Sequence, residues 1–159
     1  MDLPEVIRPL AELKRELGET PRAVELYLEL IQRAQDDGDF AQALADLDTV
    51  IAINPDDPDI QVDRAEVLLD LDRIEEASRA FVTAAGNHLA TRDIKLAVDA
   101  CHRARDLDPA SPDPHRLLAK AHLLDNQSEN AVAEYRSLWH SLLSHHRSEE
   151  RRVGKECAT

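Results

Sequence analysis

The feature that most limits what this chain can fold into is an internal repeat with a 54-residue period. Alanine recurs at positions 23, 77 and 131, and again at 43 and 97. Two residues four apart lie on one face of an α-helix, and a small residue beside a large one lets a neighbouring helix approach closely. The chain is therefore predicted to be a stack of helices. The residues four positions after these alanines are Tyr27, Phe81, Tyr135, Leu47 and Cys101.

Other marks follow the same period. Ala11, Ala65 and Ala119 are each one period apart, and Asn54-Pro55 recurs as Asp108-Pro109. Proline ends a helix because it has no N–H to donate to the preceding turn. The Asp and Ser residues that follow each proline are typical caps for the next helix. Helices are predicted over 4–17, 21–36, 40–53, 58–71, 74–91, 94–107, 112–125 and 128–146.

These marks resemble the tetratricopeptide repeat, whose second helix carries Ala-x3-Phe and a closing Pro. The segment from Gly38 to Leu44 that ends at Asn54-Pro55 is similar to such a half-repeat, as are Asp72–Ala77 with Phe81, and Ile94–Ala97. The resemblance covers Pro9 to Leu143. The family's Trp and Gly of the first helix are missing, and the 20-residue spacings favour three helices in each 54-residue unit. The resemblance to the tetratricopeptide repeat implies an all-α fold, an α-solenoid of about eight antiparallel helices.

The end of the chain has a different character. Residues 147–157 resemble the translation of a common sequencing adapter, and Arg151 and Lys155 stand where the period calls for apolar residues. Residues 1–146 are therefore predicted to form the repeat domain, truncated where a ninth helix is expected near 148. Residues 147–159 are predicted to be a non-native, disordered tail, the alternative being a genuine charged terminus.

Charge and composition restrict the partners. The formal net charge is −13, whereas a nucleic-acid binder needs a basic surface to displace counterions from phosphates. Neither nucleic acid nor an anionic membrane is expected as a partner. The N-terminus carries no signal-peptide pattern and no apolar run reaches the length of a membrane span, so a cytoplasmic location is expected.

No catalytic or cofactor motif is recognisable. The chain has no phosphate loop, and its histidines, such as His115 with His122, lack the further ligands that a zinc site needs. Asp36-Asp37-Gly38-Asp39 is interpreted as a helix connection. Cys101 occupies a large-residue position and is expected to be a buried, inert thiol. We expect no enzyme activity, no metal and no cofactor.

A stripe of acidic residues is the clearest candidate binding surface. In the tetratricopeptide family, which the chain resembles, ligands lie on the concave face, along the first helix of each repeat. Spacings of three and four put the acidic stripe on one helix face. The stripe therefore predicts a groove for a protein or peptide segment, including a basic one; the alternative is a solvated helix face. Arg116 and Lys120 are the basic pair at such places. The stripe is Asp59, Asp63, Glu66 and Asp70, with Glu5, Glu12 and Glu16 at equivalent positions one period earlier.

The last predicted helix carries an apolar stripe of Tyr135, Leu138, Trp139, Leu142 and Leu143. Without a following helix to cover it, this stripe is expected to cause self-association through the C-terminal helix. The leading hypothesis is a protein–protein interaction scaffold that binds a peptide or a partner helix on its concave face. The alternative is a regulatory repeat segment of a larger protein with a catalytic or signalling domain beyond residue 147.

Overall fold

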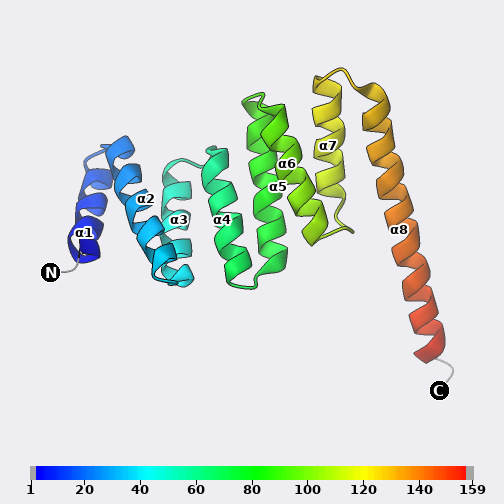
Figure 1. The fold of residues 1–159 in the computed structure, drawn as a ribbon, viewed down its shortest axis with the longest axis horizontal. Coiled ribbons are helices and arrows are strands. Elements are labelled where there is room, and N and C mark those ends of the chain that lie inside the picture. Colours follow the sequence, from blue (N-terminus) through cyan, green and yellow to red (C-terminus); the bar gives the residue numbers. More distant parts are fainter. Residues whose placement is uncertain (1–2, 157–159) are drawn as a thin grey trace. The chain divides into compact units, whose positions relative to one another are not determined.

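The computed structural model describes residues 3–156, with side-chain burial described for residues 6–143. This part of the chain is helical throughout, and its helices are joined by short turns (Figure 1). The helices are α1 (Leu3–Glu16), α2 (Thr20–Asp36), α3 (Phe40–Ile53), α4 (Pro58–Asp70), α5 (Ile74–Ala90), α6 (Ile94–Leu107), α7 (Pro112–Leu124) and α8 (Ser128–Glu156).

Two compact units divide the chain within α5. The first extends to Ala84 and the second begins at Ala85. In the first unit α1 packs on α2, α2 on α3 and α3 on α4; in the second, α6 packs on α7 and α7 on α8. Within each unit, these helices pack on their neighbours in sequence, which is the contact pattern of a TPR-like α-solenoid. The all-α fold class predicted from the period is confirmed.

The helix starts follow from local capping. The Asp39 carboxylate accepts a hydrogen bond from the Gln42 backbone N–H at 3.1 Å, and the Asp93 carboxylate accepts one from the Leu96 N–H at 3.4 Å. Such side-chain oxygens satisfy N–H groups that have no partner inside the helix. Pro58 and Pro112 occupy the first positions of α4 and α7, where no N–H donor is needed.

The turns repeat with the same period as the helices. Residues 18, 72 and 126 all have positive φ, and so do residues 38 and 92. Members of each set are one period apart, although only the first of each set is a glycine. The 54-residue repeat is therefore a repeat of backbone conformation as well as of side chains.

The core includes most of the predicted marks. Ala23, Ala77, Ala97 and Ala131 are all buried, as expected for positions where helices approach closely. The large partners Tyr27, Leu47, Phe81 and Cys101 are buried too, whereas Tyr135 is not.

The last helix differs from the prediction. α8 continues to Glu156, well past the expected end at 146, and no break occurs near 148. The segment 144–153 contains neither Gly nor Pro and is rich in Arg and Glu, which favour the helix. Residues 157–159 of the predicted tail lie outside the described residues. The non-native origin of residues 147–157 stays a prediction.

Candidate binding surfaces

Part of the acidic stripe on α4 forms an electrostatic cluster around Asp63. Burial of its half-buried carboxyl is the largest cause that raises the pKa of Asp63 above its ordinary value. The negative charges of Glu66, Asp59 and Asp57 raise the pKa of Asp63 further. Asp57 caps α4 through the Asp59 N–H at 3.1 Å, and it was not part of the predicted stripe. Burial and these acidic neighbours therefore disfavour the ionised form of Asp63.

The remaining predicted polar residues are placed as follows. Asp59, Glu66 and Asp70 are exposed on α4, and Glu12 and Glu16 are exposed on α1, while the side chain of Glu5 lies outside the described residues. Glu12 is not among the neighbours that shift the pKa of Asp63; it acts instead on Arg8 and Tyr27. Arg116 and Lys120 are exposed on α7 in the second unit, where Arg116 pairs with Asp113 at 3.0 Å.

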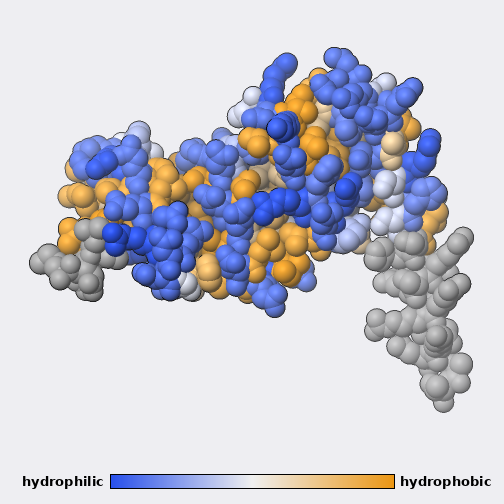
Figure 2. All heavy atoms as spheres, viewed as in Figure 1, coloured by the Kyte–Doolittle hydropathy of each residue, from blue (hydrophilic) through white to orange (hydrophobic). Residues whose placement is uncertain are grey.

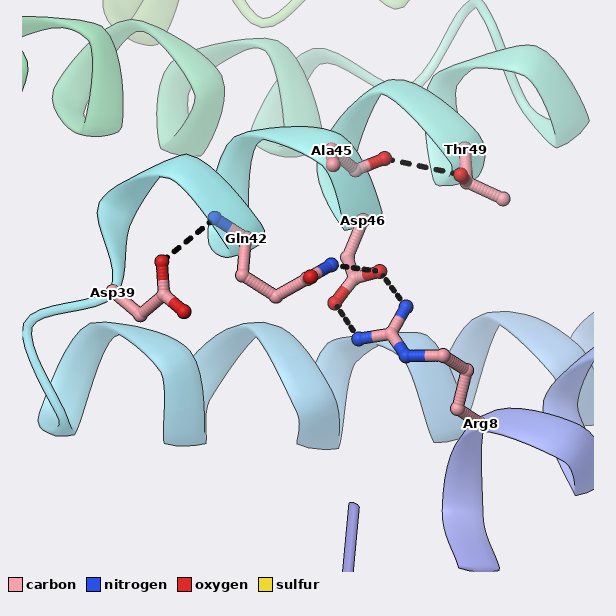
Figure 3. A network of polar contacts seen from close by, with 6 residues as sticks. All are labelled: Arg8, Asp39, Gln42, Ala45, Asp46 and Thr49. Atoms are coloured by element: carbon pink, nitrogen blue, oxygen red, sulfur yellow. Dashed lines mark hydrogen bonds and ion pairs between the residues drawn. The ribbon is translucent and has the colours of Figure 1, made fainter. Parts of the chain in front are cut away.

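An ion pair between α1 and α3 is the main polar feature that the sequence did not reveal. Arg8 donates to both carboxylate oxygens of Asp46, and the Nη2–Oδ2 distance is 2.9 Å (Figure 3). Gln42, one turn before Asp46, donates to the same carboxylate at 3.3 Å. The Asp46 side chain is only 2% exposed, and its hydrogen bond raises the pKa of Arg8. This fork-shaped pairing ties α1 to α3 across α2.

The surroundings of this pair include a small cavity of about 190 Å³ in the first unit. Arg8, Arg33 and Gln42 line it together with Asp37 and Asp39. Cations and carboxylates face it in mixed order, so its charge favours no single class of ligand. We therefore interpret the Arg8–Asp46 pair as a structural link between helices.

A second polar pair joins α7 to α8. Nδ1 of the buried His115 lies 3.0 Å from Oε2 of Glu134, and since a carboxylate only accepts, the ring N–H donates. Arg105 approaches the same oxygen at 3.9 Å. Burial raises the pKa of the nearby Cys101 thiol to about 12, and the charge of Glu134 adds to this. The buried position predicted for Cys101 is confirmed, and a thiol with such a pKa is a poor nucleophile.

The predicted apolar stripe of α8 is exposed. Tyr135, Trp139, Leu142 and Leu143 are between 42% and 62% accessible to solvent, and Leu138 is half-buried. Val132 extends the stripe by one turn. Large apolar side chains also reach the surface at α1, where orange spheres are visible in Figure 2. Clustered apolar side chains of this kind mark interaction surfaces.

Among the described residues, no group of three or more His, Cys, Asp or Glu side chains is arranged to hold a metal ion. Among those same residues, no helix combines the length and the apolar character that crossing a membrane requires.

Comparison with known proteins agrees with the repeat. The family model of the tetratricopeptide repeat matches residues 34–87, about a third of the chain. No curated protein matches the chain. The solved structure of MamA from Desulfovibrio magneticus RS-1 is 16% identical, with a TM-score of 0.41 over 91% of this chain and 97% of that chain. A thermophilic TPR protein from Thermus thermophilus is 15% identical, with a TM-score of 0.38 over 94% of this chain and 97% of that chain.

These TM-scores are low, so the assignment rests on the family model and on the repeated register of helices and turns. The chain is a tetratricopeptide-like repeat protein, in which residues 34–87 match the model of that family. A TPR-like fold suggests a protein–protein interaction scaffold.

Proposed function

We propose that this protein is an interaction scaffold that binds a basic peptide segment along the acidic face of α4. The observation that carries the proposal is the electrostatic state of Asp63. Its half-buried carboxylate is surrounded by Asp57, Asp59 and Glu66, and all three raise its pKa. A bound Lys or Arg side chain relieves this repulsion, because an opposite charge favours the ionised carboxylate.

The spacing of the stripe suits an extended or helical ligand. Asp59 and Asp70 stand eleven positions apart on α4, and a helix rises about 1.5 Å per residue, so the carboxylates span roughly 16 Å. Several basic side chains of one segment can therefore contact the stripe together. The partner class is a protein or peptide with clustered Lys or Arg residues.

The test is a titration of the full chain with a fluorescein-labelled peptide of alternating Lys and Ala. Binding is followed by fluorescence anisotropy at low ionic strength, because salt screens exposed charges. The variant D59N/D63N should weaken binding on the order of tenfold, since each exposed charge contributes about 0.2–1 kcal/mol and a half-buried one more. The matched control E75Q/D99N removes the same number of charges from exposed sites outside the stripe.

The two variants separate a site from a general effect of net charge. Equal loss of affinity in both variants would mean that the peptide responds only to the acidity of the whole chain, and the proposal would fail. A loss confined to D59N/D63N supports the α4 site. Circular dichroism of each variant checks that the helices are intact.

The exposed stripe of α8 supports a second contact surface. In the absence of a partner, we propose that copies of the chain associate through Trp139 and Leu143, which are 62% and 42% exposed. Sedimentation velocity of wild type and W139S/L143S tests this. An unchanged sedimentation coefficient across a concentration series in both proteins would rule out the self-association.

A further inference from the structure

We propose that α5 contains a hinge at Gly86, at the division between the two compact units. The first unit ends at Ala84 and the second begins at Ala85, whereas α5 continues as one helix from Ile74 to Ala90. Any change in the angle between the units therefore has to bend α5. A hinge allows this change while each unit keeps its own packing. The inference does not depend on the proposed binding at α4 or on self-association through α8.

Nothing in the packing of α5 requires a glycine at position 86. Gly18 and Gly38, in the turns after α1 and α2, both have a φ of 75°, a left-handed conformation that favours glycine. Gly86 instead lies inside a helix, and a Cβ built on it meets nothing within 4 Å. Gly86 therefore serves neither a turn nor the close approach of a neighbouring segment.

A glycine inside a helix weakens that helix, because glycine has the most backbone freedom to lose on folding. In the 54-residue repeat, position 86 is equivalent to Gln32 in α2 and to His140 in α8. α2 and α5 both have 17 residues, but α2 lies within the first unit. Among these three equivalent helices, glycine thus occurs only in the one that crosses the division between the units.

Two neighbouring residues weaken the same part of α5. Thr83 and Asn87 stand where α2 has Glu29 and Arg33, and both are poorer helix formers than the residues they correspond to. The Thr83 hydroxyl also donates to the backbone carbonyl of Arg79 at 3.0 Å. A hydroxyl that bonds to the carbonyl four positions earlier tends to bend a helix. The residues 83–87 are therefore the segment of α5 that is easiest to bend.

The weak residues lie away from the packed side of α5. Ala84 and Ala85 are completely buried, whereas Thr83 is exposed and both Gly86 and Asn87 are half-buried. Helices bend most readily by lengthening hydrogen bonds on their solvent side, where water satisfies the tilted carbonyls. The hinge motion is accordingly a change in the curvature of α5 without exposure of its buried alanines.

Hydrogen–deuterium exchange tests whether residue 86 is the weak point of the helix. G86A adds a methyl group in open space, so this variant should fold. The amides of residues 83–90 should exchange about fivefold more slowly in G86A, because alanine favours a helix over glycine by about 0.8–1.0 kcal/mol. In the control T49A, α3 loses a hydroxyl that donates to the Ala45 carbonyl at 3.0 Å, and exchange in α5 should not change.

Double electron–electron resonance tests whether the weak point acts as a hinge. Spin labels are attached to the variant A41C/K120C/C157S, at exposed positions of α3 in the first unit and α7 in the second, while Cys101 is buried. An excess of unlabelled chain removes the contribution of distances between copies. The distribution of distances between the two labels should be narrower when G86A is added to this variant.

Q32G is the matched control, because it places a glycine at the equivalent position of α2. Exchange in α2 should become faster in Q32G, and the width of the distance distribution should stay the same. If G86A leaves the width unchanged, Gly86 is a local weak point only and the hinge is wrong, even where exchange slows. Unchanged exchange at residues 83–90 in G86A, or a distribution that broadens in Q32G, also overturns the inference.

Discussion

The turn after α5 holds Arg92 at a φ of 64°, a left-handed conformation that favours glycine. The equivalent turn after α2 has Gly38 at a φ of 75°. Both turns close with the same pair of backbone hydrogen bonds: residue 92 or 38 donates to a carbonyl three positions earlier, and the next residue donates to one five positions earlier. R92G should therefore stabilise the protein, and G38R should destabilise it.

The magnitude follows from two opposing terms. The left-handed conformation destabilises the folded state by roughly 1–2 kcal/mol for a residue with a Cβ, and glycine removes this strain. Glycine also has more freedom in the unfolded chain, which lowers the stability by roughly 0.5–1 kcal/mol. The net gain for R92G is about 0.5–1 kcal/mol in the free energy of unfolding. A Cβ at Gly38 meets nothing within 4 Å, so G38R should lose a similar amount through backbone strain alone. Replacing Asp72 or Asn126, which also have positive φ, with glycine should stabilise the protein less, because Asp and Asn tolerate this conformation better than Arg.

Urea denaturation followed by circular dichroism at 222 nm measures these differences, with the slope compared between variants to detect any departure from a single transition. R92K serves as the control, because it keeps a long cation and a Cβ at the turn. If R92G is neutral or destabilising while G38R costs nothing, the strain assigned to these turns is absent and the reasoning fails.

Three further predictions concern buried or half-buried ionisable groups. R8A should destabilise the protein by roughly 1–3 kcal/mol, because it leaves Asp46 buried without its cation, whereas R8L/D46L should recover most of the loss; urea denaturation of the single and double variants checks this. The raised native pKa of Asp63 means that the folded chain binds more protons than the unfolded chain between the ordinary and the raised pKa, so this group's contribution to stability declines as pH rises through that window. D63N should accordingly stabilise the protein at pH 7 relative to wild type and lose this advantage below about pH 4, as measured by thermal unfolding of both proteins across pH. Cys101, with a pKa of about 12, should resist Ellman's reagent at pH 8 in the folded C157S variant and react fast in urea; fast labelling of the native protein would contradict its burial.

Much of the fold was predictable because its signals are local. The Ala-x3-aromatic marks and the prolines after Asn54 and Asp108 act within one or two helical turns, so helix boundaries agree within a residue or so up to the start of α8. The predicted end of α8 at residue 146 was wrong. The helix was expected to end where the repeat is lost, but the residues that follow favour a helix and continue it to Glu156.

The candidate surfaces were only partly predictable. Spacing alone assigned Asp59 and Asp63 to one face of α4, and the effect of the Asp59 charge on the pKa of Asp63 agrees with that. Spacing places Glu12 one turn after Arg8 on α1, but it could not show that Glu12 also lies near Tyr27, because that depends on how α1 packs against α2. The Arg8–Asp46 and His115–Glu134 pairs join residues 38 and 19 positions apart, and neither recurs with the period.

The sequence by itself determined the helices, their 54-residue register and the small residues at which they approach, because these depend on the side-chain period of a single helix. The tertiary structure decided which equivalent positions are covered. Tyr27 and Tyr135 have the same place in the register, yet α3 packs on α2, while no described helix covers the outer face of α8. Burial depends on the neighbouring helix rather than on the residue itself, and for that reason the contrast between these two tyrosines required the packed structure.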